Sequence, residues 1–538
     1  MSDLRTLYRE ASHYLGGQLG VLALGFVSFP ILTRLLSVRQ YGMLALTLQV
    51  TAMAAVVSKM GLQHSIQRFY QDHAASTHEG ALRKFYSTLL FGAALCGMAV
   101  ALLFLIGLGL VPNSFVSPVL KKVLVLGSAL IFIESLGPIV MNFLRAQRRT
   151  KAFNAVTVLT RGTTIAVVCL LLFTWNRGVS AVLIGTVAVE LVSVLVIVVL
   201  LLPPGMISAS AFDQTLFWGA VTFGFPLVGY ELASVILDSG DRILVQHYLG
   251  FQALGYYSAG YNISNYVAMF VRTPVNLAMF PIYMKLWVSR GPEETRAFLS
   301  TTLDNFLLLS VCVLAGVAVT SRYAVIVLGS RKLQEAYPLL PVLVLGLTLH
   351  SLQMFFNAGL VIHKKTFTMF KFVAASAVLN IVLNVLLIPR IGLQGAAVAT
   401  LLSYAVFLGL TIRESFALLP LQFDILACSR YLGAGVISVL LVSRVHCSSD
   451  FLNLVVRGAL SVLVYGAVLW GIDRRFRLTL ADIISPAGRV LKKQDSEFTA
   501  AATVESCSKS RHSDESANVI VARRRLARAS SGQKEWPS

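Results

Sequence analysis

The chain has 538 residues, of which 56% are hydrophobic and 13% are charged, and its formal net charge is +20 at pH 7. Apolar runs of about 20 residues, the length that crosses the hydrocarbon of a bilayer, alternate with short polar loops over most of this length. A soluble core could not bury so many runs. The composition therefore excludes a soluble protein and indicates an all-α polytopic membrane protein.

We expect about 14 transmembrane helices, arranged as two sets of six and a weaker final pair. The first set is predicted at residues 12–36, 40–62, 85–111, 119–144, 152–174 and 178–202. The second set is predicted at residues 214–238, 251–284, 297–320, 336–362, 367–388 and 391–412. The final pair is predicted at residues 426–443 and 452–472.

Features of the second set repeat features of the first. The stretch Lys364–Thr400 holds a basic loop, an apolar run with two asparagines and a glycine break, and a fainter copy lies roughly 210 residues earlier. The segment from Arg34 to Gly42 matches the segment from Arg242 to Gly250 at nearly the same distance. These matches indicate an internal duplication. Because each copy holds six helices, an even number, both copies enter the membrane the same way round, as parallel repeats.

The predicted organisation has four parts, namely a six-helix bundle at 1–202, its repeat at 203–413, two additional helices at 414–472 and a tail at 473–538. Basic residues are modestly enriched in the loops of one side, which predicts that both termini are cytoplasmic. The tail is rich in Ser, Ala and charge. We expect a disordered basic cytoplasmic tail, with contact to anionic lipid headgroups as the second interpretation.

Five ionisable side chains lie well inside the predicted spans: Glu134, Arg161, Glu190, Glu231 and Arg272. Such groups are costly in a membrane unless they are paired or hydrated, so they mark either structural pairs or a cavity. For Glu190 and Arg161, on neighbouring spans, a structural pair is favoured. Glu231, Glu134 and Glu190 are the candidates for binding and releasing a proton during transport, and a permanent salt bridge of Glu231 to Arg272 or Arg161 is an equal alternative.

The eighth predicted span has a polar face along its length. At about 100° per residue, six polar side chains fall on one arc: Tyr257, Tyr261, Asn265, Arg272, Asn276 and Tyr283. This face could be buried through interhelical hydrogen bonds, but six polar groups favour the wall of a hydrated cavity. Arginine can bind a phosphate with two hydrogen bonds, and tyrosine and asparagine suit sugar hydroxyls. The predicted substrate site comprises Tyr257, Tyr261, Asn265, Arg272, Asn276 and Arg161.

The sequence has no motif for covalent chemistry. It has no nucleophile elbow, Walker loop, HExxH motif or glycine-rich nucleotide loop, and no loop is long enough for a catalytic domain. The six cysteines are scattered without the spacing of metal ligands. We therefore expect no enzyme activity, cofactor or metal site, and no ATP-driven transport by this chain alone. The positive charge suits cytoplasmic loops and an anionic substrate, and no nucleic-acid partner is expected.

Three segments, taken in their order and spacing, show a family resemblance. They are Phe29 to Leu36 with Tyr41 and Gly42, Asp241 and Arg242 with Leu254 to Tyr257, and Leu379 to Ala397 with its Pro389 and Gly392. In these segments the chain resembles the Wzx-type polysaccharide flippases of the multidrug/oligosaccharidyl-lipid/polysaccharide exporter superfamily. The resemblance covers about residues 5–470.

This resemblance implies a V-shaped, MATE-like arrangement of two six-helix bundles around a cationic cavity, with two extra C-terminal helices. It implies a substrate of undecaprenyl-diphosphate-linked oligosaccharide, flipped across the bacterial inner membrane for O-antigen or exopolysaccharide synthesis. Alternating access driven by an ion gradient or the membrane potential would move it. Arg272 resembles the cavity arginines of such flippases in role. Membrane lipid is a further expected partner, and a polysaccharide polymerase and glycosyltransferases are candidate partners.

Three other functions stay open. A MATE-type drug/cation antiporter should favour carboxylates in its cavity, whereas the mid-membrane Arg161 and Arg272 favour an anion. A flippase for the peptidoglycan precursor lipid II would recognise the same lipid-linked diphosphate group. A membrane scaffold that recruits polysaccharide enzymes would be the third function. Loops this short offer such partners little binding surface, although the tail could bind them.

Overall fold

Helices make up nearly all of the chain that the computed structural model describes, residues 2–75, 80–114, 116–175, 178–474 and 476–477, and no strand occurs there. The first set is α1 (Ser2–Leu35), α2 (Val38–Ser58), α3 (Leu62–Ala74), α4 (Ala81–Leu110), α5 (Pro118–Ala146), α6 (Thr150–Trp175) and α7 (Val179–Val196). The second set is α8 (Gln214–Ser239), α9 (Asp241–Arg290), α10 (Pro292–Ala324), α11 (Leu339–Ile362), α12 (Thr366–Ile391) and α13 (Leu393–Leu418). The final helices are α14 (Ile425–Val442) and α15 (Asp450–Ile472).

The predicted polytopic all-α fold is confirmed. Twelve apolar helical stretches among the described residues are long enough to cross a membrane. One of them, Gln214–Arg290, contains both α8 and α9, and the shorter apolar stretch Gly20–Leu35 lies in α1. The second predicted span differs from the structure, because its helix ends at Ser58 and a separate helix, α3, follows.

The chain divides into two compact units, residues 1–465 and 466–538. The predicted boundaries at 202, 413 and 472 stay predictions. Apart from residues 473, 474, 476 and 477, the predicted cytoplasmic tail lies outside the described residues.

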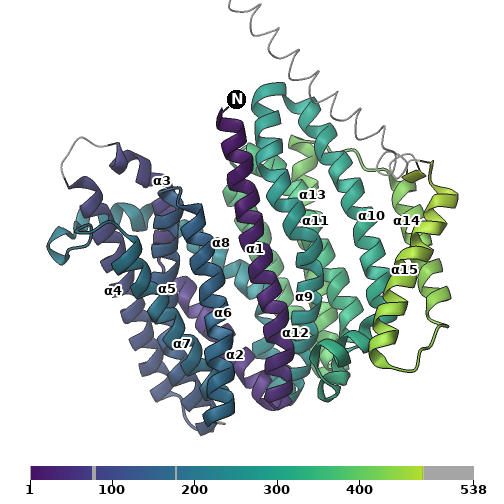
Figure 1. The fold of residues 1–538 in the computed structure, drawn as a ribbon, viewed down its shortest axis with the longest axis horizontal. Helices are drawn as coiled ribbons and strands as arrows, with labels where there is room; N and C mark the ends of the chain where they lie inside the picture. Colours follow the sequence, from purple (N-terminus) through teal and green to yellow (C-terminus); the bar gives the residue numbers. More distant parts are fainter. Residues whose placement is uncertain (1, 76–79, 115, 176–177, 475, 478–538) are drawn as a thin grey trace, which may run out of the picture. The chain divides into compact units, whose positions relative to one another are not determined.

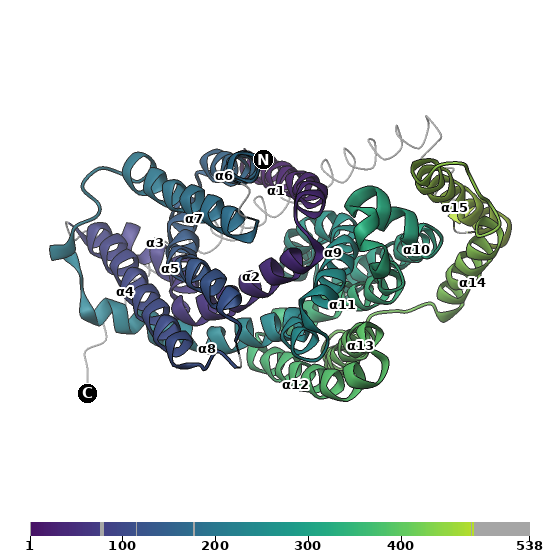
Figure 2. The same cartoon turned by 90° about the horizontal axis from the view of Figure 1, so that it is seen from below.

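Helix packing within the first unit brings the two predicted repeats together. In Figures 1 and 2, α3 to α7 gather on one side and α9 to α13 on the other. Helix α1 packs against α6, and α8 packs against α12, which is the equivalent contact in the second set. Between the sets, α2 packs against α9, and α3 packs against α8. These four helices form the interface that carries the site described below.

Two glycines allow α2 and α9 to cross closely. A methyl group on Gly42 would clash with the carbonyl oxygen of Phe251, and one on Gly255 would clash with the carbonyl oxygen of Val38. The two contacts are equivalent if Gly42 corresponds to Gly255 and Val38 to Phe251. This correspondence differs from the predicted match of Gly42 with Gly250. Gly250 takes a left-handed conformation and divides α9 into two helical segments.

Replacing Gly255 by Val should lower the apparent melting temperature of the detergent-solubilised protein. The side chain would meet backbone, which cannot rotate away, and overpacking of this kind costs about 1–3 kcal/mol. Gly409→Val in α13 is the matched control, because nothing lies within 4 Å of a methyl group there. Equal melting temperatures for the two variants would show that the close crossing does not limit stability.

Candidate functional site

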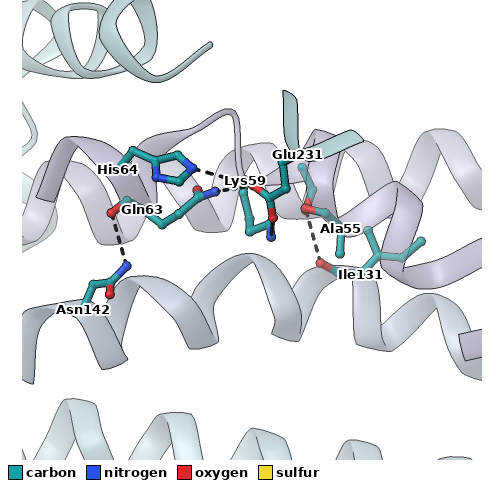
Figure 3. Close-up of polar contacts among 8 residues, drawn as sticks. Ala55, Lys59, Gln63, His64, Ile131, Asn142 and Glu231 are labelled. Carbon is teal, nitrogen blue, oxygen red and sulfur yellow. Dashed lines mark hydrogen bonds and ion pairs between the residues drawn. The ribbon is translucent and has the colours of Figure 1, made fainter. Parts of the chain in front are cut away.

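The clearest polar contact between the two helix sets is made by Glu231 of α8. Its Oε1 accepts from Lys59 Nζ, and its Oε2 accepts from Gln63 Nε2 at 2.9 Å. His64 Nε2 lies 3.8 Å from the same Oε2. Figure 3 shows these three side chains, all from the α2–α3 region, converging on the single carboxylate. Glu231 therefore pairs with Lys59, and neither Arg272 nor Arg161 is its salt-bridge partner.

The break between α2 and α3 positions this contact. Met60 and Gly61 have φ angles of 47° and 74°, in the left-handed region that favours glycine. Gly61 also lies directly against Gly224 of α8, and a methyl group on either residue would clash with the backbone of the other. Ser65 Oγ then donates to the carbonyl oxygen of Ala220 at 2.7 Å. The broken helix is thus anchored to α8 at Gly224 and Ala220, both on the N-terminal side of Glu231.

Helix α5 supports the same region from within the first set. Asn142 Nδ2 donates to the carbonyl oxygen of Gln63 at 3.2 Å, as Figure 3 shows. Ser58 Oγ lies 3.5 Å from the carbonyl oxygen of Ile131, also on α5. These contacts hold the ends of α2 and α3 next to the break, so Lys59 and Gln63 are presented to Glu231 by fixed backbone.

Three of the predicted ionisable residues line shared cavities in the first set. Glu134 of α5, Arg161 of α6 and Glu190 of α7 line one cavity of about 290 Å³ and another of about 480 Å³. The larger cavity extends to α1 and to Tyr266 and Thr273 of α9. The charge of Arg161 interacts with both carboxylates. Within the described residues these groups make no ion pair closer than 4 Å, so the structure does not show the expected tight pair of Glu190 with Arg161.

Arg272 of α9 keeps its guanidinium available. The side chain is half-buried, and among the described residues it has no hydrogen-bond or ion-pair partner. Its charge interacts with His350 of α11. The adjacent residue Thr273 lines the larger cavity. An arginine without a protein partner at membrane depth is suited to an anionic ligand.

The first part of the predicted polar stripe is packed inside the second set. Tyr257 is fully buried and donates to Asp241, whose carboxylate also accepts from Thr400 at 3.2 Å. Tyr261 lies beneath the Arg242 guanidinium, 4.9 Å from it, and its hydroxyl lies 3.4 Å from that of Tyr404. In this conformation both tyrosines serve interhelical hydrogen bonding, the alternative that the sequence had left open.

The remaining members of the stripe differ from one another. Asn265 is half-buried and lies with Nδ2 3.6 Å from the sulfur of Met269, whereas Asn276 is exposed and Tyr283 is buried. Two polar residues outside the stripe reach the first set instead. Asn262 Nδ2 donates to the Tyr41 hydroxyl at 2.7 Å, and the Tyr266 hydroxyl donates to the Gly25 carbonyl oxygen at 3.1 Å.

Three residues of the site were not predicted from the sequence. Lys59 falls near the end of a predicted unbroken span, Asp241 appears only within a family motif, and His350 is not among the predicted site residues. The signal for Lys59 was present, because a lysine followed by glycine two residues later at the end of an apolar run can mark a break in a helix. For His350, the only signal was a titratable group in an apolar run.

Comparison with known proteins gives a family. The model of the polysaccharide biosynthesis protein family matches residues 31–338, more than half of the chain. The succinoglycan biosynthesis transport protein ExoT of Rhizobium meliloti is 23% identical over 350 residues, which cover 64% of this chain and 67% of that protein. An uncharacterized membrane protein of Methanocaldococcus jannaschii is 27% identical over 205 residues, covering 36% of this chain and 38% of that protein.

Solved structures show the same fold. The lipid II flippase MurJ in an inward closed conformation superposes with a TM-score of 0.70 at 15% identity, covering 84% of this chain and 98% of that chain. A multidrug resistance MATE family transporter in an inward-facing conformation superposes with a TM-score of 0.58 at 12% identity, covering 75% of this chain and 95% of that chain. At these identities the likeness supports the MATE-like fold alone.

Proposed function

The chain belongs to the polysaccharide biosynthesis protein family, and from this premise we propose that it flips undecaprenyl-diphosphate-linked oligosaccharide across the bacterial inner membrane. The Wzx-type family predicted from three sequence segments is confirmed. The named relative is a transport protein of polysaccharide biosynthesis. The proposal adds that the cargo is lipid-linked. It also places this multi-pass protein in the inner membrane with both termini in the cytoplasm, and it gives the polysaccharide polymerase and glycosyltransferases as its partners.

The observation that carries the proposal is the unpartnered guanidinium of Arg272. A diphosphate offers oxygens that arginine can bind through two parallel hydrogen bonds, and arginine stays charged whatever its surroundings. Thr273 brings this part of α9 to the larger cavity, which Arg161 lines from the opposite helix set. We assign the diphosphate to Arg272, with Arg161 as a second cationic contact.

The sugar part would occupy the larger cavity and the polar positions of α9. Asn265 is half-buried and Asn276 is exposed, so both have hydrogen-bonding capacity for hydroxyl groups. Tyr257 and Tyr261 could join them only in a conformation that breaks their present hydrogen bonds, which run to Asp241 at the start of α9 and to Tyr404 of α13. Their predicted role as sugar contacts therefore requires movement of α9 against α13.

The carboxylates are assigned to energy coupling. Glu134 and Glu190 line the cavities beside Arg161, and Glu231 joins the two helix sets through Lys59. A carboxylate whose cationic partner leaves during alternating access can bind a proton or a metal cation in its place. A gradient of that ion, or the membrane potential, would then drive the conformational cycle.

A second candidate function has one observation in its favour. Two glutamates and one arginine line the same cavities, and a net negative lining suits the cationic drug of a MATE-type antiporter. The unpartnered Arg272 disfavours that cargo by charge repulsion, which is why we rank the flippase first.

Deletion of the gene should trap undecaprenyl-diphosphate-linked oligosaccharide inside the cell. Synthesis on the cytoplasmic leaflet would continue while export stops, so we expect accumulation of one repeat unit and loss of surface polysaccharide. Mass spectrometry of a total lipid extract measures the trapped species and identifies its sugars.

Other results of the same extraction separate the alternatives. Accumulation of lipid II would assign the chain to peptidoglycan synthesis, and unchanged lipids with lost drug tolerance would assign it to drug export. Loss of surface polysaccharide without any trapped intermediate, together with reduced glycosyltransferase recruitment, would indicate a scaffold. Complementation with the intact gene is the control for effects on neighbouring genes.

A further inference from the structure

An apolar cavity of about 530 Å³ lies where α1 meets α9, beside the larger of the two cavities described above. The two helices lie next to each other in Figures 1 and 2. The cavity is completed by α10 and by the short helical segment Val325–Gly329 that continues it. Among the described side chains that line it, Tyr266 alone carries a polar group, and the others are aliphatic or aromatic. A lining of this kind suits a hydrocarbon ligand.

The cavity opens toward the hydrocarbon of the bilayer. Three of its lining side chains are exposed on the surface of the protein, namely Phe26 at 44%, Val27 at 52% and Phe270 at 71%. Phe26 and Val27 lie in the apolar stretch of α1, and Phe270 lies in an apolar stretch long enough to cross a membrane. Large apolar side chains are stable against lipid chains and unstable against water. A lipid chain can therefore enter the cavity from the side.

Tyr266 of α9 stands between this apolar cavity and the larger cavity, which Arg161 lines. Tyr266 and Leu22 of α1 line both cavities, so the two adjoin there. The Tyr266 hydroxyl donates to the carbonyl oxygen of Gly25 at 3.1 Å. Its ring can lie this close to α1 because Gly25 has no side chain. A ligand that occupied both cavities would pass beside this one tyrosine.

Helix α9 lines the two cavities with adjoining faces. At about 100° per residue, Val267 and Phe270 lie on the face that lines the apolar cavity, whereas Met269 and Thr273 lie on the next face, which lines the larger cavity. Arg272 follows Phe270 by two residues, which is roughly 3 Å along the helix axis. An anionic group at Arg272 would therefore have the apolar cavity within reach of any chain attached to it.

We propose that the apolar cavity binds the isoprenoid chain of the lipid carrier, in the units next to the diphosphate. This inference rests on the proposed function, which places the diphosphate on Arg272 and the sugars in the larger cavity. A hydrocarbon chain is unfavourable in a hydrated cavity, so the chain has to leave that cavity close to the diphosphate. The apolar cavity supplies the exit, because it adjoins the larger cavity at Tyr266 and opens toward the bilayer. The sugars and the chain would then lie on opposite sides of Tyr266.

Photolabelling tests this placement without any substitution. The full-length protein in lipid nanodiscs is treated with a farnesyl diphosphate analogue that carries a diazirine on its chain, and the labelled peptides are identified by mass spectrometry. We expect label on residues 22–29 of α1 and 263–270 of α9, and we expect excess inorganic diphosphate to prevent it.

The other labelling results contradict the inference in different ways. Label on the same peptides that inorganic diphosphate does not prevent would show that the chains of bilayer phospholipids occupy the cavity without regard to a diphosphate, and would overturn the inference. Label that inorganic diphosphate prevents but that lies on other helices would overturn it and leave the anion site standing. Failure of the protein to bind inorganic diphosphate at all would overturn the anion site, and with it both proposals.

Affinities for farnesyl diphosphate and for inorganic diphosphate, measured in one detergent, give a second test. Ala23 lines the apolar cavity and is exposed, so Ala23→Trp should fill space there without displacing a buried neighbour. We expect this variant to lower the affinity for farnesyl diphosphate by about 10-fold or more relative to that for inorganic diphosphate. Ala375→Trp is the matched control and should leave this ratio unchanged, because Ala375 is an exposed alanine of α12 that lines neither cavity. The same ratio in wild type and Ala23→Trp would contradict binding of the chain in this cavity.

Discussion

Replacing Arg272 by Ala is expected to abolish transport of the lipid-linked oligosaccharide while the protein still accumulates in the membrane. Arg272 has no partner among the described residues, so its removal leaves no buried group unpaired and should not unfold the chain. Hydrogen bonds to charged groups contribute about 1.5–3 kcal/mol each. Loss of two such bonds to the diphosphate should lower transport by about 100-fold or more.

Arg272→Lys keeps the charge but loses the planar pair of donors, so it should restore transport in part. Arg390→Ala is the control, since Arg390 is an exposed arginine in the last turn of α12. Transport is measured as trapped lipid-linked oligosaccharide in a deletion strain that carries each variant, with membrane protein levels measured by immunoblot. Normal export by Arg272→Ala would remove Arg272 from the substrate site.

The membrane spans could be predicted from the sequence because each of them needs only a long apolar run. The sequence was not sufficient for the break between α2 and α3. The predicted span 40–62 includes Lys59 and Gly61, because two such residues hardly change the mean hydropathy over the length of a membrane span. The break became visible only from the left-handed angles at Met60 and Gly61. The same break places Lys59 against Glu231.

The sequence predicts which ionisable side chains lie well inside a membrane span, but it does not predict which of them pair with one another. A salt bridge of Glu231 to Arg161 or Arg272 is one of the two interpretations that the sequence offers, because all three residues lie well inside their predicted spans. The partner is Lys59, far away in sequence, because α3 packs on α8 and brings it there. Helix periodicity likewise grouped Tyr257 with Asn276 on one face. It could not show that Tyr257 is covered by Asp241 and Thr400 while Asn276 stays exposed.

Replacing either partner of the Lys59–Glu231 pair should destabilise the packing of α3 on α8. The Lys59 side chain is 13% exposed and that of Glu231 is 28% exposed. Removal of one partner from a buried pair costs about 3–5 kcal/mol, and partial hydration here should reduce this to at most about 3 kcal/mol. Lys59→Met and Glu231→Gln should therefore each lower the apparent melting temperature, and the double variant should recover most of the loss.

Transport separates a structural pair from a coupling site. If the pair only holds α3 on α8, the double variant should regain transport together with stability. We expect instead that Glu231→Gln, alone or with Lys59→Met, slows transport in vesicles and weakens its response to an imposed ion gradient, because the amide cannot exchange an ion. Wild-type turnover by Glu231→Gln would remove Glu231 from coupling.

The reversed pair Lys59→Glu with Glu231→Lys completes the test. It keeps an ion pair between α2 and α8 but moves the carboxylate from α8 to the break. A structural pair should tolerate the exchange, since the attraction between the charges is unchanged. A coupling carboxylate should not, because Gln63 donates to its Oε2 and His64 lies 3.8 Å from it. Recovered stability with slow transport in this variant would therefore locate coupling at Glu231 itself.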